Sequence, residues 1–127
     1  MNLLKLFGLG RRQQNAVSRI GVEEAHELVT AGRLMLIDVR HPQEWNETGR
    51  PAGSYGVTLQ DREFELKVLE ILGDDKSKPV ALSCRTGARS SRGADRLVAA
   101  GHMNVSNIEG GFLAWKKAGL PIDAGPF

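Results

Sequence analysis

The sequence is poor in cysteine, with Cys84 alone among 127 residues. One cysteine cannot form a disulfide within the chain, so we expect the fold to depend on its hydrophobic core and the protein to work in a reducing compartment, the cytoplasm. Cys84 also has no partner at the spacing of a zinc site, and His26, His41 and His102 are scattered along the chain. No glycine-rich nucleotide-binding loop follows a predicted strand. We therefore expect neither a metal nor a cofactor.

The sequence also lacks a strong excess of charge. Its net charge of +2 gives no reason to expect binding to nucleic acid. The positive charge is concentrated at the start, where residues 1–19 contain four basic side chains and no acid. Within that region, residues 1–15 form a basic and apolar tail without the long apolar centre or the cleavage site of a secretory signal. Leu3, Leu6 and Phe7 could share one helical face, so contact with a membrane surface is the alternative to a frayed or locally packed terminus.

Strand-like apolar runs alternate with segments of helical periodicity from residue 16 to residue 127. Nearly continuous apolar runs, such as residues 33–40, are typical of strands covered on both faces of a parallel sheet. Extended segments are predicted near Ile20 and at residues 33–40, 79–83 and 105–108. A turn-rich loop is predicted over residues 49–56, and it leads to a short apolar piece around Val57 and Leu59. Helices are predicted within residues 18–32, 41–45, 61–72, 93–100 and 112–118. This alternation predicts one α/β domain over residues 16–127, with a parallel sheet and helices on both faces.

A few large side chains can be assigned to the core or the surface. His26 lies off the apolar stripe of its predicted helix, so we expect it on a solvated face. Trp45 and Trp115 are expected in the core, because each belongs to a short helical segment beside apolar residues. His102 follows Gly101 and is expected to be a capping or turn residue.

One segment predicts a strand, a tight loop and a helix with chemistry at their junction. After the apolar run 79–83 come Cys84, Arg85, Thr86, Gly87, Ala88, Arg89, Ser90 and Ser91. Backbone N–H groups that turn inward at the positive end of a helix dipole favour a thiolate. Nearby arginines act in the same direction, and cysteines in such surroundings have pKa values lowered from about 8.5 to roughly 3.5–7.5. The sequence therefore predicts Cys84 as a nucleophile, against the plainer interpretation of a small buried apolar residue.

The spacing of the arginines separates two kinds of anion chemistry. Arg89, near the start of the helix, is the better candidate for contact with a bound anion, and the orientation of Arg85 is left open. Cysteine-dependent phosphatases place five residues between their cysteine and their arginine, and here Ser90 occupies that position while Arg89 falls one residue short. The smaller loop argues against a phosphatase or an arsenate reductase. It suits an anion whose reacting atom is a single sulfur.

Together with two other motifs, this loop resembles the rhodanese family of single-domain sulfurtransferases over about residues 17–123. The matching segments are residues 36–40 with Glu44 and Trp45, residues 84–90, and residues 109–115 with 119–121. The resemblance implies a parallel five-stranded sheet flanked by helices, and a Cys84 that carries a sulfane sulfur as a persulfide. It also implies a donor-binding loop made of Arg85, Thr86, Gly87, Ala88 and Arg89. Asp38 and Arg40 match a structural charged pair, and Ser90 a supporting residue.

The activity implied by the resemblance is that of a thiosulfate sulfurtransferase without a cofactor. The donor would be thiosulfate or a similar anion, and the acceptor cyanide in assays and a small or protein thiol in cells. The alternative is a sulfur-relay or sensory module that serves one protein partner. One segment departs from the family pattern: residues 49–54 read Gly-Arg-Pro-Ala-Gly-Ser, so Arg50 stands where the family usually has histidine.

Overall fold

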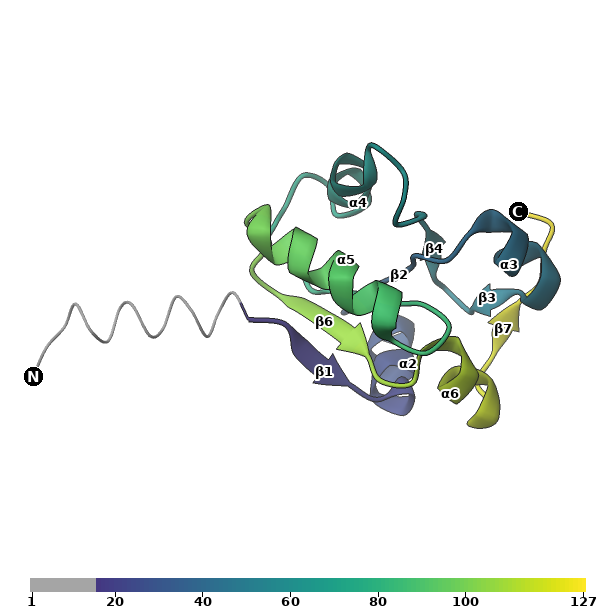
Figure 1. The fold of residues 1–127 in the computed structure, drawn as a ribbon. Coiled ribbons are helices and arrows are strands. Elements are labelled where there is room, and N and C mark those ends of the chain that lie inside the picture. Colours follow the sequence, from purple (N-terminus) through teal and green to yellow (C-terminus); the bar gives the residue numbers. More distant parts are fainter. Residues whose placement is uncertain (1–15) are drawn as a thin grey trace, which may run out of the picture.

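The computed structural model describes residues 16–127, which form a five-stranded parallel sheet with helices on both faces (Figure 1). The predicted tail of residues 1–15 lies outside the described residues. The strands are β1 (Ser18–Ile20), β2 (Met35–Asp38), β3 (Arg50–Pro51), β4 (Tyr55–Gly56), β5 (Val80–Ser83), β6 (Val105–Ile108) and β7 (Ile122–Asp123). The helices are α2 (Val22–Thr30), α3 (Pro42–Thr48), α4 (Phe64–Ile71), α5 (Ala88–Ala99) and α6 (Gly111–Lys117). The α/β prediction is therefore confirmed.

The main sheet has the strand order β1-β6-β5-β2-β4, and all of its pairs are parallel. In the register of β2 and β5, Asp38 lies opposite Ser83. Because the two strands run in the same direction, the segments that follow Asp38 and Ser83 leave the sheet at the same edge. That edge is where open α/β sheets usually place their sites.

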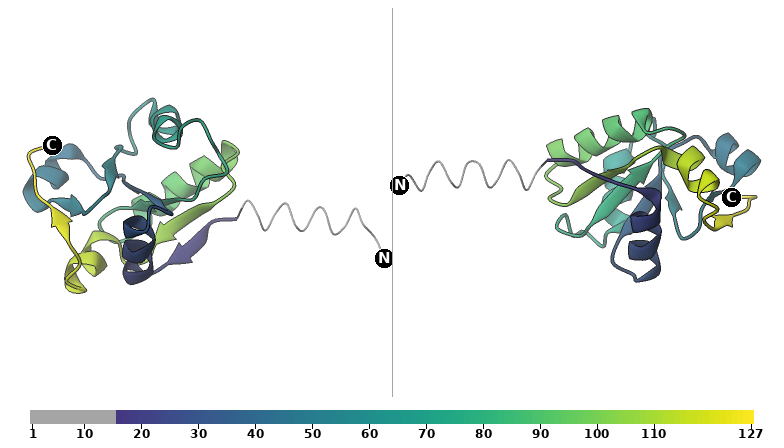
Figure 2. Two further views of the ribbon diagram at one scale, coloured as in Figure 1. Left: turned by 180° about the vertical axis from the view of Figure 1, so that it is seen from behind. Right: turned by 90° about the horizontal axis from the view of Figure 1, so that it is seen from below.

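Two helices cover each face of the sheet (Figure 2). On one face α4 and α5 pack on the strands, and on the other α2 and α6 do so. The largest core side chains on the two sides are Phe64 of α4 and Trp115 of α6, which are 0% and 1% exposed. Every residue of β5 and β6 is buried, as expected for central strands covered on both faces.

The start of α5 differs from the prediction. The helix begins at Ala88 and not at Gly93, so only residues 85–87 remain as a loop after Cys84. Gly87, with φ of 120°, allows the chain to reverse within those residues. In the sequence, the apolar stripe of this helix can be recognised only from Ala94 onward. The first turn instead buries the polar side chain of Ser90, so it does not show the apolar pattern of a helix.

The sequence did not locate the fifth strand of the sheet. This strand is β4, which lies inside residues 49–56, where the sequence predicts a turn-rich loop. A Cβ on Gly56 would lie 2.6 Å from Cη2 of Trp45. The strand therefore needs glycine at this position, and that glycine gave the segment the composition of a loop.

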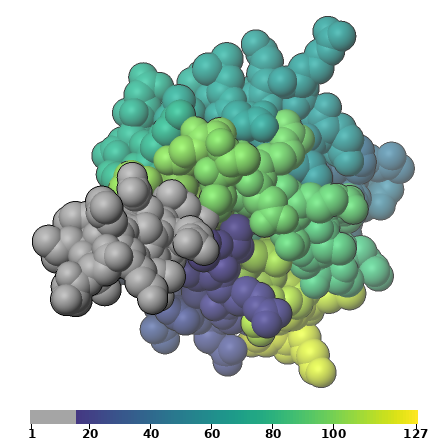
Figure 3. All heavy atoms as spheres, turned by 60° about the vertical axis from the view of Figure 1, so that its left-hand side comes forward, coloured from purple at the N-terminus to yellow at the C-terminus, as the bar shows by residue number. Residues whose placement is uncertain are grey.

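A small second sheet joins the end of the chain to α3. Strand β3 pairs antiparallel with β7, and the backbone N–H of Phe127 donates to Oδ1 of Asn46 at 2.9 Å. In the main sheet, β1 and β4 are the two edge strands. Figure 3 shows β1 in purple at the molecular surface. None of the helices between residues 16 and 127 has both the length and the apolar character needed to cross a bilayer.

His26 and His102 have different surroundings in the fold. The prediction of a solvated His26 is wrong, because its ring packs edge-on against Trp115, with centroids 5.7 Å apart, where α2 and α6 meet. His102 lies in the turn after α5, where its backbone N–H donates to the carbonyl of Leu97. Its side chain is 1% exposed.

Candidate active site

Cys84 directly follows β5, and its sulfur faces the turn that leads into α5. The backbone N–H of Gly87 donates to Sγ at 3.0 Å, and Oγ of Ser90 lies 3.4 Å from it. The carbonyl groups of the same turn point away: the carbonyl of Cys84 accepts from the N–H of Phe112 and that of Arg85 from the N–H of Leu113. Helix α6 thus binds carbonyl groups of the turn. The N–H of Gly87 in the same turn remains available for the sulfur of Cys84.

The close contact between α6 and the turn requires glycine. Gly111 has φ of 57°, and a Cβ at this position would lie 2.5 Å from the carbonyl oxygen of Cys84 and 2.7 Å from that of Arg85. No side chain fits between these backbones. The glycine pair of residues 110–111 is therefore part of the support of the cysteine turn.

The environment of Cys84 favours the thiolate. Burial alone raises the pKa of the Cys84 thiol, since the side chain is 1% exposed. The hydroxyl of Ser90 and the backbone N–H groups of Ser90, Gly87 and Thr86 outweigh burial, so the pKa lies below its ordinary value. The groups that lower it most are hydrogen-bond donors of the turn, and not the arginines emphasised by the sequence analysis.

Ser90 also connects the thiol to a residue on the neighbouring strand. Its Oγ lies 2.6 Å from Oδ1 of Asn107, and Nδ2 of Asn107 donates to the carbonyl of Gly87 at 3.2 Å. Asn107 lies near the carboxyl end of β6, beside β5, and is 9% exposed. We gave Asn107 no role from the sequence. An amide near the end of a buried parallel strand was the signal that could have identified it.

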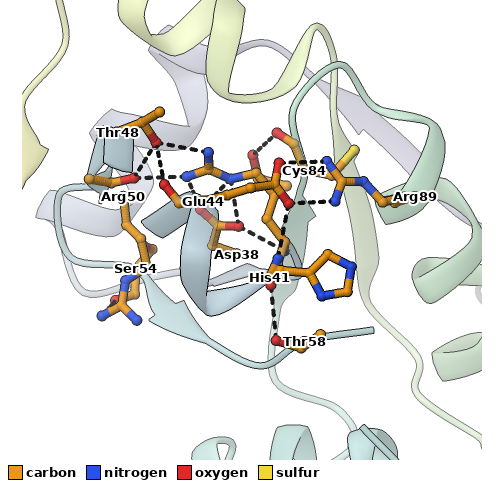
Figure 4. Close-up of polar contacts among 12 residues, drawn as sticks. Asp38, His41, Glu44, Thr48, Arg50, Ser54, Thr58, Cys84 and Arg89 are labelled. Carbon is orange, nitrogen blue, oxygen red and sulfur yellow. Dashed lines mark hydrogen bonds and ion pairs between the residues drawn. The ribbon is translucent and has the colours of Figure 1, made fainter. Parts of the chain in front are cut away.

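Arg89 forms a close ion pair with Glu44 of α3 (Figure 4). Its Nη1 and Nη2 donate to Oε1 and Oε2 of Glu44 at 2.7 and 2.9 Å, and the two side chains are 24% and 26% exposed. The hydrogen bonds from Arg89 hold the pKa of Glu44 at about 2, below its ordinary value of 4.5, and the same pair raises the pKa of Arg89. The guanidinium predicted to contact a donor anion is thus already paired with a carboxylate.

Glu44 is the second residue whose role the sequence did not reveal. It lies in the first turn of α3, where Oε1 accepts a hydrogen bond from the backbone N–H of His41. Glu44 and Arg89 are separated by 45 positions in the chain. The resemblance included Glu44 among the matching residues, but only the structure brings it to the cysteine loop.

The other arginines of residues 84–96 do not form one cluster. Arg85 is exposed and lines a pocket of about 230 Å³ together with Phe112 and Lys116. Arg96 points to the other end of α5, where it pairs with Glu65. Thr86 and Ala88 are also exposed.

Asp38 and Arg40 form a buried ion pair at the end of β2. Nη2 of Arg40 lies 2.8 Å from Oδ2 of Asp38, and the two side chains are 2% and 0% exposed. Arg40 also donates to the carbonyl of Gly49 and to Oγ1 of Thr48, and its guanidinium lies 4.3 Å above the ring of Phe112. These contacts join β2, α3 and α6, so the pair holds the elements around the cysteine turn.

The atypical segment of residues 49–54 is directed away from the thiol. The guanidinium of Arg50 stacks between the rings of Trp45 and Phe127, at 5.1 and 4.0 Å from their centroids. In Figure 4 Arg50 lies on the opposite side of Asp38 and Glu44 from Cys84. Among residues 16–127, no group of histidine, cysteine, aspartate and glutamate side chains is arranged to hold a metal ion.

Comparison with known proteins gives one consistent family. The sequence profile of the rhodanese-like domain matches residues 21–118. The chain is 34% identical over 116 residues to thiosulfate sulfurtransferase 16, chloroplastic, of Arabidopsis thaliana. The aligned region covers 84% of this chain and 93% of that relative. The chain is also 30% identical over 105 residues to thiosulfate sulfurtransferase GlpE of Vibrio cholerae. This aligned region covers 83% of this chain and 93% of that relative.

A solved structure from Rhodopseudomonas palustris is similarly close. It is described as a protein of unknown function and possible tyrosine phosphatase. The two chains are 30% identical and superpose with a TM-score of 0.74, over 84% of this chain and 85% of the other.

Proposed function

This chain belongs to the rhodanese-like family of sulfurtransferases, and from that premise we propose that it transfers a sulfane sulfur through a persulfide on Cys84. The donor is thiosulfate or a similar anion, and the acceptor is a thiophile. The observation that carries the proposal is the Cys84 sulfur, held at the end of β5 by the N–H of Gly87 and near the hydroxyl of Ser90. The chemistry needs no cofactor, because the thiolate is itself the nucleophile.

In the first half-reaction the Cys84 thiolate attacks the outer sulfur of thiosulfate. A bond forms between Sγ and that sulfur, the sulfur–sulfur bond of the donor breaks, and sulfite leaves with the bonding electron pair. The product is a persulfide that carries one negative charge on its terminal sulfur. No proton has to move, so a histidine base is not required when the pKa of Cys84 is already lowered.

The turn can stabilise the charge of this persulfide. The backbone N–H groups of Thr86, Gly87 and Ser90 already act on the Cys84 sulfur, and they are proposed to stabilise the terminal sulfur of the persulfide in the same way. Fixed N–H dipoles in a site with little water stabilise an anion more than the same groups do in bulk water. In the second half-reaction an acceptor attacks the terminal sulfur and Cys84 leaves as the thiolate.

The acceptor in the cell is proposed to be a small thiol or a protein thiol, while cyanide serves in assays. The cytoplasm remains the proposed location, because a single cysteine that must stay reduced suits that compartment. The phosphatase hypothesis remains disfavoured by the count from Cys84 to Arg89. Helix α5 also begins directly after Gly87, which leaves a short cradle for a phosphoryl group.

Thiocyanate formation tests the proposed function. The wild-type protein, incubated with thiosulfate and cyanide, is expected to form thiocyanate, and Cys84→Ser to form none. Hydrolysis of p-nitrophenyl phosphate is measured with the same two proteins. Phosphate release that depends on Cys84, without any thiocyanate, would contradict the proposal and revive the phosphatase hypothesis.

A further inference from the structure

Arg89, the arginine that the sequence favours for contact with a donor anion, is not a free cation in the fold. Arg89 uses Nη1 and Nη2 on the two carboxylate oxygens of Glu44, at 2.7 and 2.9 Å. About three quarters of each side chain is buried. Arg89 and Cys84 are near enough to interact electrostatically, so the charge of Glu44 is also part of the surroundings of the thiol.

Two further arginines, one at the end of β2 and one in the last turn of α5, are also paired with acids. Arg40 is held by Asp38 in the buried pair at the end of β2. Arg96 pairs with Glu65, further along α5. Of the four arginines in residues 84–96, the fold pairs Arg89 and Arg96 with acids and leaves Arg85 and Arg92 exposed. The turn offers a donor its N–H groups and the exposed Arg85, rather than a cluster of free guanidinium groups.

We propose that Glu44 sets the charge selectivity for the sulfur donor, by occupying Arg89 and so disfavouring dianionic donors relative to monoanionic donors. This inference rests on the proposed sulfur transfer through Cys84. A dianion such as thiosulfate experiences twice the repulsion from the Glu44 carboxylate that a monoanion does. It also cannot recruit Arg89 without leaving a partly buried carboxylate unpaired, which is costly. The donor class favoured by this site is therefore one with a single negative charge, such as a thiosulfonate or a persulfide.

Two donors that carry the same reacting sulfur atom but differ in net charge test the effect of donor charge. Thiosulfate carries two negative charges, whereas methanethiosulfonate has a methyl group in place of one oxygen and carries one. Each gives its outer sulfur to the Cys84 thiolate, and the leaving groups are sulfite and methanesulfinate, which take the electron pair of the broken sulfur–sulfur bond. The measured quantity is the ratio of kcat/KM for thiosulfate to kcat/KM for methanethiosulfonate.

The main variant is Glu44→Gln, which keeps an oxygen for the N–H of His41 but removes the charge. We expect the ratio to rise at least about fivefold, and the rise to shrink in high salt because the interaction is electrostatic. Glu44→Asp keeps the charge and is expected to stay near the wild-type ratio. Glu65→Gln is the matched control, because it removes an acid paired with another arginine of α5, far from the thiol. Its ratio should equal that of the wild type.

A double variant, Glu44→Gln with Arg89→Gln, keeps the test open if the single variant does not fold. Since it removes both charges, it leaves no unpaired group, and we expect a ratio within about twofold of the wild type. A large fall in the double variant would contradict the inference, because it would show that Arg89 binds the dianion in spite of Glu44.

Two further outcomes are distinguishable. An unchanged ratio in Glu44→Gln, or the same rise in Glu65→Gln, overturns the selectivity inference while leaving sulfur transfer intact. Failure of the wild-type protein to take sulfur from either donor onto Cys84 overturns the proposed function itself. Intact mass measured on the same samples separates these cases, because a loaded persulfide adds one sulfur atom to the protein.

Discussion

The hydroxyl of Ser90 lies 2.6 Å from Oδ1 of Asn107 and 3.4 Å from the sulfur of Cys84. A serine hydroxyl has one proton, so it can donate to only one of these acceptors at a time. The amide of Asn107 is fixed in turn by its hydrogen bond to the carbonyl of Gly87. Ser90 is therefore oriented beside the thiol, where its proton can turn to the sulfur when the thiolate forms.

Removing this hydroxyl should weaken the thiolate. Ser90→Ala is expected to raise the pKa of Cys84, because the thiolate loses the hydrogen bond from the Ser90 hydroxyl. The pH dependence of the alkylation of Cys84 by iodoacetamide measures this pKa, and the curve should move to higher pH. Ser91→Ala is the control, because none of the hydrogen bonds at the sulfur involves Ser91. A curve that stays in place for Ser90→Ala would contradict the role of the hydroxyl.

The ion pair of Glu44 and Arg89 should make stability depend on pH in the acid range. The pKa of Glu44 is about 2 in the folded protein and near 4.5 when the chain is unfolded. Because the folded value is lower, the stabilisation is complete above about pH 4.5 and is lost as the pH falls to about 2. Glu44→Gln should lower the free energy of unfolding by about 1–3 kcal/mol at pH 7.

Urea unfolding of the wild type and Glu44→Gln at several pH values checks this prediction. The difference between the two proteins should be constant above about pH 5 and should vanish near pH 2. A difference that is independent of pH would show that Glu44 contributes through packing or helix capping and not through its charge.

The sequence was sufficient for the fold class and for the place of Cys84 between a strand and a helix. The apolar run before Cys84 and the Gly87 turn identify a strand end and a loop without any long-range information. The partners Glu44 and Asn107 could not be found in the same way. Each comes from a different element, and only the parallel pairing of β5 with β2 and β6 brings them to Cys84. The short strand β4 was missed because its glycine serves the packing of Trp45.

The buried pair of Asp38 and Arg40 should be essential for stability. Asp38→Ala leaves the guanidinium of Arg40 buried without its carboxylate, which is expected to cost about 3–5 kcal/mol. Urea unfolding at pH 7 measures the loss. Glu109→Gln is the control, since it breaks an ion pair with Arg19 whose side chains are 58% and 73% exposed, and should cost about 0–1 kcal/mol. Equal losses in the two variants would contradict the structural role of the buried pair.

The glycine contact behind the cysteine turn gives a further prediction. Gly111→Ala places a methyl group against the carbonyl oxygens of Cys84 and Arg85, so it should displace the turn and slow sulfur loading at least about tenfold. Gly119→Ala is the matched control, because Gly119 also has a positive φ, of 72°, but its Cβ would meet nothing within 4 Å. This control should lose about 1 kcal/mol of stability and keep its rate of sulfur loading. Equal loading rates in the two variants would contradict the support by α6.

The most direct test of the account is the intact mass of the protein after brief exposure to thiosulfate. We predict a gain of one sulfur atom in the wild type, its removal by cyanide, and no gain in Cys84→Ser. A wild-type protein that takes up no sulfur from any anionic donor, or a Cys84→Ser variant that takes it up as the wild type does, would contradict the assignment of Cys84 as the sulfur carrier.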